Sequence, residues 1–182
     1  MNALLKDVSI AFCQDLFTPG SNDPTQKLAW TSTFIFAKDS DADKTMLDIM
    51  DKVAHEKWGK DAAKTFTDLK NKDKICYKDG DTKIMYGGFE GNMFVSARNG
   101  KCAPQVLNRD LKPITESQGL IAPGCIVNAL IDVWAQDNKY GKRINALLLG
   151  VQYVSGVQNN TAFEALPPLE CSGSEEDGFG LF

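Results

Sequence analysis

The sequence predicts a mainly β protein, in which a small strand-built barrel is interrupted by one helical insertion and followed by an acidic C-terminal tail. Segments rich in β-branched and aromatic residues recur through residues 1–156, with turn residues between them. A three- and four-residue apolar period occurs once, within about residues 40–70, and after residue 156 the chain becomes acidic and glycine-spaced. We therefore expect one domain over residues 1–156 and a flexible tail over residues 157–182.

Two strands are expected near the start of the chain, at residues 8–17 and 27–37. Both segments are rich in β-branched and aromatic residues, and the turn cluster at residues 18–24 separates them. Strand signals return at residues 74–78 and, after a glycine-punctuated stretch, at residues 92–99. These segments give the first half of the expected barrel.

The longest strands are expected at residues 124–136 and 142–155, joined by a polar hairpin at residues 137–141. Alternate residues from Cys125 to Val133 are apolar, so one face of the first strand belongs to the core. The other face is available to a ligand, and three of its residues are Asn128, Asp132 and Trp134.

The insertion is expected to begin with a helix over residues 43–58, capped by Ser40 and Asp43 and ended by Gly59. Its apolar stripe comprises Met46, Leu47, Met50, Val53, Ala54 and Trp58. A shorter helix is expected at residues 61–69. Because strands that leave and re-enter around a single insertion suit a closed barrel better than a doubly wound sheet, we expect an OB-fold-like Greek-key barrel.

Composition excludes several classes of protein. Apolar residues make up 43% of the chain, which is enough for a core, yet no stretch approaches the roughly 18 apolar residues that a bilayer span requires. The first twenty residues do not resemble a secretion signal. The five cysteines have no paired spacing, which argues against a disulfide framework and a zinc site. We expect a cytosolic protein with no membrane partner.

Catalytic motifs are absent from the sequence. The single histidine, His55, has no nucleophile pattern around it, and no phosphate-binding loop occurs. Asp39, Asp41 and Asp43 imitate the start of a calcium loop, but Lys44 stands where that loop needs glycine. We therefore expect no enzyme activity, no cofactor and no metal.

Aromatic and basic residues lie side by side in several segments, which favours binding of an unpaired nucleic acid. Such binding needs cations for the phosphates and ring faces on which bases stack. Each ring has basic neighbours: Trp30 has Lys27, Tyr77 has Lys74 and Lys78, Tyr86 has Lys83, Phe94 has Arg98 and Lys101, and Tyr140 has Lys139, Lys142 and Arg143. Two alternatives stay open. Phe94 and Trp30 could fill the barrel, and the basic residues could be ordinary solvated surface.

The C-terminal tail is distinctive in charge. Residues 144–182 contain five carboxylates and no lysine or arginine, whereas residues 1–143 contain 20 basic and 19 acidic side chains. An acidic run with exposed apolar residues can dock into a basic-rimmed pocket of another protein, or serve only for solubility. The residues expected to bind a partner are Glu175, Glu176, Asp177, Phe179, Leu181 and Phe182.

The chain resembles the phage-encoded single-stranded DNA-binding proteins with an OB fold. The resemblance rests on the order and spacing of segments 27–38, 58–59, 77–81, 92–98, 104–114, 123–128 and 150–152. It implies sequence-tolerant binding of single-stranded DNA in the cytoplasm of a bacterial host, during replication, recombination or repair. It also implies that the tail recruits replication or recombination proteins. By position, it adds Arg109 to the binding face, beside Trp30, Phe94, Arg98, Lys101 and the Tyr140 hairpin.

A second interpretation is a phage protein–protein adaptor or virion component, in which an OB-like barrel is only a scaffold and the tail does the binding. Replacing the basic residues of the expected face separates the two interpretations, because an adaptor would be indifferent to their loss. A homo-oligomer is possible under either interpretation.

Overall fold

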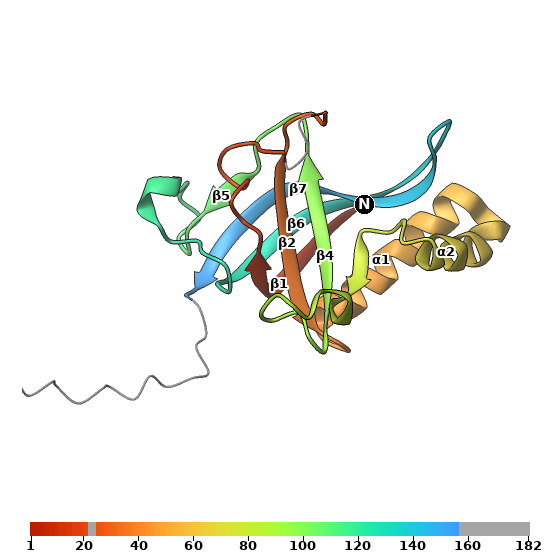
Figure 1. The fold of residues 1–182 in the computed structure, drawn as a ribbon, viewed down its shortest axis with the longest axis horizontal. Coiled ribbons are helices and arrows are strands. Elements are labelled where there is room, and N and C mark those ends of the chain that lie inside the picture. The colour runs from red at the N-terminus through yellow and green to blue at the C-terminus, as the bar shows by residue number, and fades with distance from the viewer. Residues whose placement is uncertain (22–24, 157–182) are drawn as a thin grey trace, which may run out of the picture.

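The computed structural model describes residues 1–21 and 25–156. Its strands form one sheet in the order β3-β4-β2-β1-β6-β7-β5, shown in Figure 1. The strands are β1 (Asn2–Ala11), β2 (Trp30–Ala37), β3 (Tyr77–Asp79), β4 (Asn92–Asn99), β5 (Gln105–Leu107), β6 (Ile126–Asn138) and β7 (Gly141–Ser155). The helices are α1 (Asp41–Trp58), α2 (Ala62–Asn71) and three short 3-10 turns, η1 (Gly59–Asp61), η2 (Gly80–Lys83) and η3 (Glu116–Gln118).

The sheet curls into a barrel because β4 and the segment before β3 meet β7. Ile75 pairs with Ile144, and the Cys76 amide donates to the Ile144 carbonyl at 2.9 Å. On β4, the buried Asn99 side-chain amide donates to the Leu148 carbonyl of β7 at 3.0 Å. The five longer strands therefore surround one core, as in an OB-type barrel.

The alternation expected along β6 is confirmed. The inward residues Cys125, Val127, Ala129, Ile131 and Val133 are at most 3% exposed. On the outer face, Asn128 and Asp132 are half-buried and Trp134 is exposed. Because β6 pairs with β7 over its whole length, the outer faces of the two strands form one continuous surface.

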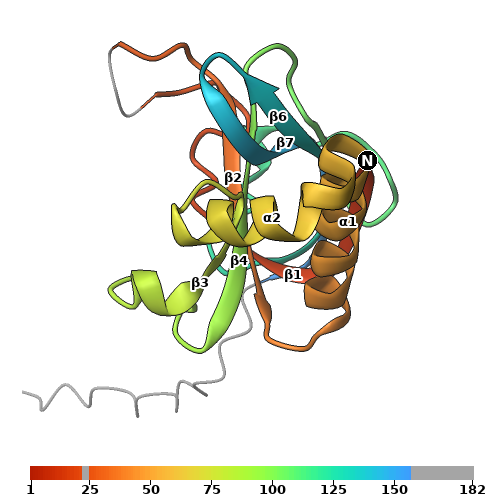
Figure 2. The ribbon, with the colours of Figure 1, turned by 90° about the vertical axis from the view of Figure 1, so that its right-hand side faces the viewer.

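Helix α1 packs beside the barrel and α2 follows it across a short turn, as Figure 2 shows. The expected caps are present: the Ser40 hydroxyl accepts a hydrogen bond from the Asp43 amide at 3.3 Å, and Gly59 has φ of 52°. Leu47 was expected in the buried stripe but is 44% exposed. The apolar residues that α1 buries are Ala42, Met46, Ile49, Met50, Val53 and Ala54. Within the described residues, neither helix is long and apolar enough to cross a bilayer.

Two strand boundaries differ from the sequence expectation. The first strand lies at Asn2–Ala11 rather than residues 8–17. It ends at Ala11, and the next residue, Phe12, has a left-handed φ of 48°. The strand expected at residues 74–78 lies at Tyr77–Asp79, which pairs with β4, whereas Ile75 bridges to Ile144 of β7.

A buried hydrogen bond ties α1 to the barrel. The Tyr77 hydroxyl donates to Asp43 Oδ1 at 2.5 Å, and the Asp39 amide donates to Asp43 Oδ2 at 2.9 Å. Both Tyr77 and Asp43 are 5% exposed. Burial, and then the Asp43 carboxylate, raise the pKa of Tyr77 above its ordinary value.

Tyr77→Phe is expected to lower the free energy of unfolding by about 1–3 kcal/mol, because a buried carboxylate oxygen loses its donor. The raised pKa of Tyr77 means that the unfolded chain ionises first, so the wild type should lose stability as pH rises above about 10. Tyr77→Phe should weaken this alkaline loss. Urea unfolding at pH 8 and pH 10.5 measures both effects; an unchanged alkaline loss would contradict the assignment.

Candidate nucleic-acid interface

Two cavities open on the outer surface of the barrel and share Ser96 and Arg98 of β4. The first, the basic cavity, has a volume of about 450 Å³. Its lining residues include Lys27, Lys74, Cys76, Lys78, Ser96, Arg98, Trp134 and Arg143. The second, the tyrosine cavity, has a volume of about 560 Å³. Its main lining residues are Phe12, Thr31, Thr33, Lys83, Tyr86, Ser96 and Arg98. Because they share a wall, we treat the two as one binding groove.

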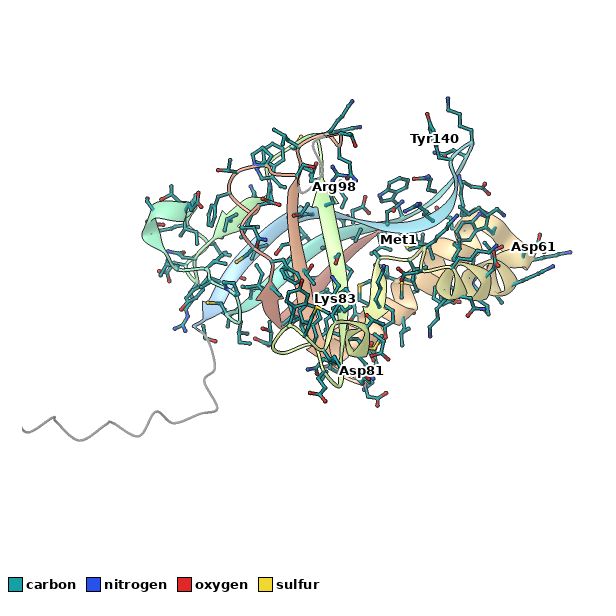
Figure 3. The ribbon with its side chains drawn as sticks, viewed as in Figure 1. Met1, Asp61, Asp81, Lys83, Arg98 and Tyr140 are labelled. Atoms are coloured by element: carbon teal, nitrogen blue, oxygen red, sulfur yellow. The ribbon has the colours of Figure 1, made fainter. Side chains whose placement is uncertain are left out.

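The register of the sheet explains why these residues meet. Thr31 and Thr33 of β2 pair with Arg98 and Ser96 of β4, so their side chains share the outer face. The Thr33 and Ser96 hydroxyls are 3.0 Å apart. In Figure 3, Arg98 and Lys83 lie one above the other along these two strands, and Tyr140 lies at the hairpin tip. The floor of the tyrosine cavity is therefore small and hydroxyl-bearing.

Barrel closure brings the remaining basic residues to the groove. The segment before β3 supplies Lys74, β3 itself supplies Lys78, and β7 supplies Arg143. Arg98 is held at the junction because its Nη2 donates to the Lys27 carbonyl at 2.5 Å. Within the described residues, the groove gathers six basic side chains, Lys27, Lys74, Lys78, Lys83, Arg98 and Arg143, against two carboxylates, Asp15 and Asp73. The field in the groove is positive, although the net charge of the chain is −4.

Aromatic rings support Lys83 at one end of the groove. Its Nζ lies 5.2, 5.8 and 5.0 Å from the ring centroids of Phe12, Phe89 and Phe94. Burial, followed by the charge of Lys78, lowers the pKa of Lys83. Tyr86 packs edge-to-face on Phe12 at 5.0 Å and is 46% exposed. Tyr86 therefore presents a supported ring beside a cation.

A polar clamp fixes the loop that carries Lys83 and Tyr86. Lys38 Nζ lies 3.2 Å from Asp79 and 3.3 Å from Asp81. Asp81 Oδ1 also accepts the Gly91 amide at 2.7 Å, and this bond, together with Lys38, lowers the pKa of Asp81. Gly80 packs so closely that an added Cβ would lie 2.0 Å from the Phe89 carbonyl. The clamp therefore holds the loop against β4.

Of the predicted site residues that the structure describes, three line the groove: Tyr86, Arg98 and Arg143. The prediction is wrong for Phe94 and Tyr77 as stacking faces, because they are 1% and 5% exposed. Phe94 does lie on the outer face with Arg98, but Phe89 covers it, with ring centroids 5.2 Å apart. Tyr77 packs on Phe36 at 6.3 Å inside the barrel.

Trp30 is also outside the groove. It packs partly buried against the main core and pairs in register with the inward-facing Asn99. Its Nε1 donates to the Phe17 carbonyl at 3.4 Å. The ring therefore lies on the inner side of β2. Of the two interpretations of Trp30, packing inside the barrel is the one that the structure shows.

The other predicted basic residues lie on separate surfaces. Arg109 donates to the Val154 carbonyl, about 35 Å along β7 from Arg143 at ordinary strand rise. Lys142 lies 3.6 Å from Asp137 and 5.6 Å from the Trp58 ring, on the side of α1. Two exposed positions lie elsewhere, namely Lys101 after β4 and Lys139 at the hairpin tip with Tyr140. None of these side chains lines either cavity.

Several residues that line the groove were not among the predicted site residues: Phe12, Lys27, Lys74, Lys78, Lys83 and Trp134. Signals for five of these six were present in the sequence. The four lysines are sequence neighbours of the selected rings, and strand alternation placed Trp134 on the available face of β6. The tail positions lie outside the described residues: Glu175, Glu176, Asp177, Phe179, Leu181 and Phe182.

A family model described as Enterobacter phage Enc34, ssDNA-binding protein, matches residues 1–161 of the chain. The chain belongs to this family. This member of the Enc34 family is 34% identical over 156 residues to protein p50 of Acyrthosiphon pisum secondary endosymbiont phage 1. That alignment covers 84% of this chain and 83% of p50. The predicted resemblance to phage single-stranded DNA-binding proteins is confirmed.

Solved structures agree with the family assignment. The single-stranded DNA-binding protein of bacteriophage Enc34 in complex with ssDNA matches with 25% identity and a TM-score of 0.67, covering 85% of this chain and 86% of that one. The bacteriophage T7 single-stranded DNA-binding protein gp2.5 matches with 12% identity and a TM-score of 0.57, covering 92% of this chain and 97% of that one. The gp2.5 match shows a shared fold. The predicted β barrel with a helical insertion is thus confirmed.

Proposed function

We propose that this protein binds single-stranded DNA with little sequence preference, and that the strand lies in the binding groove. The observation that carries the proposal is the convergence of six basic side chains with the exposed rings of Tyr86 and Trp134. Membership of the Enc34 family supports it, as does similarity to the Enc34 protein in complex with ssDNA. The proposed role is non-enzymatic and belongs to the cytoplasm of the phage's host.

The chemistry of the groove fits an unpaired strand. Lysine and arginine bind phosphates of any sequence, and each base stacked on a ring contributes roughly 1–3 kcal/mol. A duplex keeps its bases paired and stacked on each other, so it cannot use the rings. The groove is therefore expected to prefer single strands while reading little sequence.

Fluorescence anisotropy titrations test the proposal. The protein is titrated into labelled oligo-dT and into a labelled duplex of equal length, at a series of salt concentrations. Affinity for oligo-dT should exceed affinity for duplex. The logarithm of the binding constant should fall with the logarithm of salt, with a slope of about −0.7 for each phosphate contact. Equal affinity for both ligands, or no binding of either, would contradict the proposal.

We further propose that the protein acts in replication, recombination or repair, and that Glu175–Asp177 and Phe179–Phe182 bind a replication or recombination protein. Acidic charge beside aromatic residues supports this role, because a basic-rimmed apolar pocket would take both. Deleting residues 173–182 should leave oligo-dT affinity equal or higher and abolish retention of the partner from host extract. Weaker oligo-dT binding after truncation would contradict it.

A further inference from the structure

We infer that the binding groove separates two kinds of contact: the basic cavity binds the phosphates of a strand independently of its bases, whereas the tyrosine cavity receives a base. This inference rests on the proposed function and assigns the parts of the nucleotide to the two cavities. It predicts that a polyanion without bases binds to one part of the groove only.

The basic cavity has the composition of a phosphate site. Five of its side chains are basic and one is a carboxylate, Asp73, which is neutralised by Lys78 at 2.7 Å. Cys76 in its wall adds no negative charge near neutral pH, because burial raises the pKa of this thiol to about 12. Among the described residues of this cavity, the one ring is Trp134. Electrostatic contacts therefore dominate inside it.

Trp134 lies on the β6 side of the basic cavity. It pairs with Asn145, so its ring shares the outer face with Arg143, two residues earlier on β7. Trp134 also lines a separate cavity with Val53 and Lys57 of α1. Trp134 thus lies between the basic cavity and this second cavity, so a base attached to a phosphate in the basic cavity can reach its ring.

The tyrosine cavity has a different composition. Its floor carries the Thr31, Thr33 and Ser96 hydroxyls, and its wall carries the supported ring of Tyr86. It has two basic side chains: Arg98, which it shares with the basic cavity, and Lys83, whose ammonium lies over three rings. A flat ring above a small hydroxyl floor suits a base better than a phosphate.

Competition by inorganic polyphosphate against labelled oligo-dT tests this separation. In the double variant Lys78→Ala/Arg143→Ala, the polyphosphate concentration needed for half displacement, corrected for oligo-dT affinity, should rise about tenfold, because two phosphate contacts are lost. In Tyr86→Ala, this concentration, corrected for oligo-dT affinity, should stay within about twofold, while oligo-dT affinity itself falls about tenfold. Lys44→Ala/Lys64→Ala removes two exposed cations of α1 and α2 and should behave as wild type.

Thermal unfolding checks that each variant is folded, and Lys78→Gln/Arg143→Gln replaces the alanine pair if that pair does not fold. Polyphosphate that fails to compete with bound oligo-dT, or that Tyr86→Ala weakens as strongly as the basic pair, would overturn the separation and leave the proposed function standing. A wild type that binds no oligo-dT would instead refute the proposed function.

Discussion

Replacing Lys78, Arg98 and Arg143 together with alanine is expected to lower the affinity for oligo-dT about fiftyfold at 0.15 M salt. The three side chains come from β3, β4 and β7 and meet in the basic cavity. If each binds one phosphate, the log–log salt slope should also become about 2 less steep. Anisotropy titrations of wild type and variant at several salt concentrations give both quantities.

Lys101→Ala/Arg109→Ala/Lys142→Ala provides the matched control, because it removes the same charge from predicted residues that lie outside both cavities. Its affinity should stay within about threefold of wild type, since distant exposed charges are screened by salt. A control variant that loses as much affinity as the groove variant would refute the groove as the binding surface. If neither variant loses affinity for oligo-dT, the result would favour the interpretation of the protein as a protein–protein adaptor.

Phe94→Ala is expected to lower the free energy of unfolding by about 3–5 kcal/mol, because it leaves a cavity among buried rings. Phe94 is 1% exposed and packs on Phe89, and Lys83 Nζ lies 5.0 Å from its ring. Tyr86→Ala, in the same cluster but 46% exposed, should cost much less stability. Urea unfolding of both variants measures the difference.

Binding by the two variants should show the opposite order. At a temperature at which Phe94→Ala remains folded, its affinity for oligo-dT should change less than that of Tyr86→Ala. A Phe94→Ala protein that unfolds at the wild-type urea concentration but no longer binds oligo-dT would show that this ring stacks on bases.

The fold could largely be predicted from local patterns. The two-residue alternation of apolar side chains predicts which face of β6 is buried. Ser40 and Gly59 mark the two ends of α1. The first strand was misplaced because no compositional signal marks Ala11 as its last residue or the left-handed φ of Phe12 that follows. The short β5 was missed because its parallel pairing with β7 depends on contacts distant in sequence.

The site was harder to predict because it depends on how distant segments pack. Alternation correctly placed Phe94 on the face of Arg98, but it could not show that Phe89, five residues earlier, folds over that ring. Lys74 and Arg143 meet because the backbone of the segment before β3 bonds to β7. Sequence spacing identified the types of residue that bind an unpaired strand. Which of these residues lie together in the groove depends on how the barrel closes.

Tryptophan fluorescence during oligo-dT titration tests most directly whether the strand lies in the groove. Trp134 lines the basic cavity, Trp30 packs against the core, and Trp58 donates to Asp137 beside α1. Each tryptophan is replaced by phenylalanine in a separate variant, and the quenching at saturation is compared. We predict that quenching is largely lost in Trp134→Phe and retained in the other two. Quenching retained in Trp134→Phe and lost in Trp58→Phe would place the DNA on another face of the barrel.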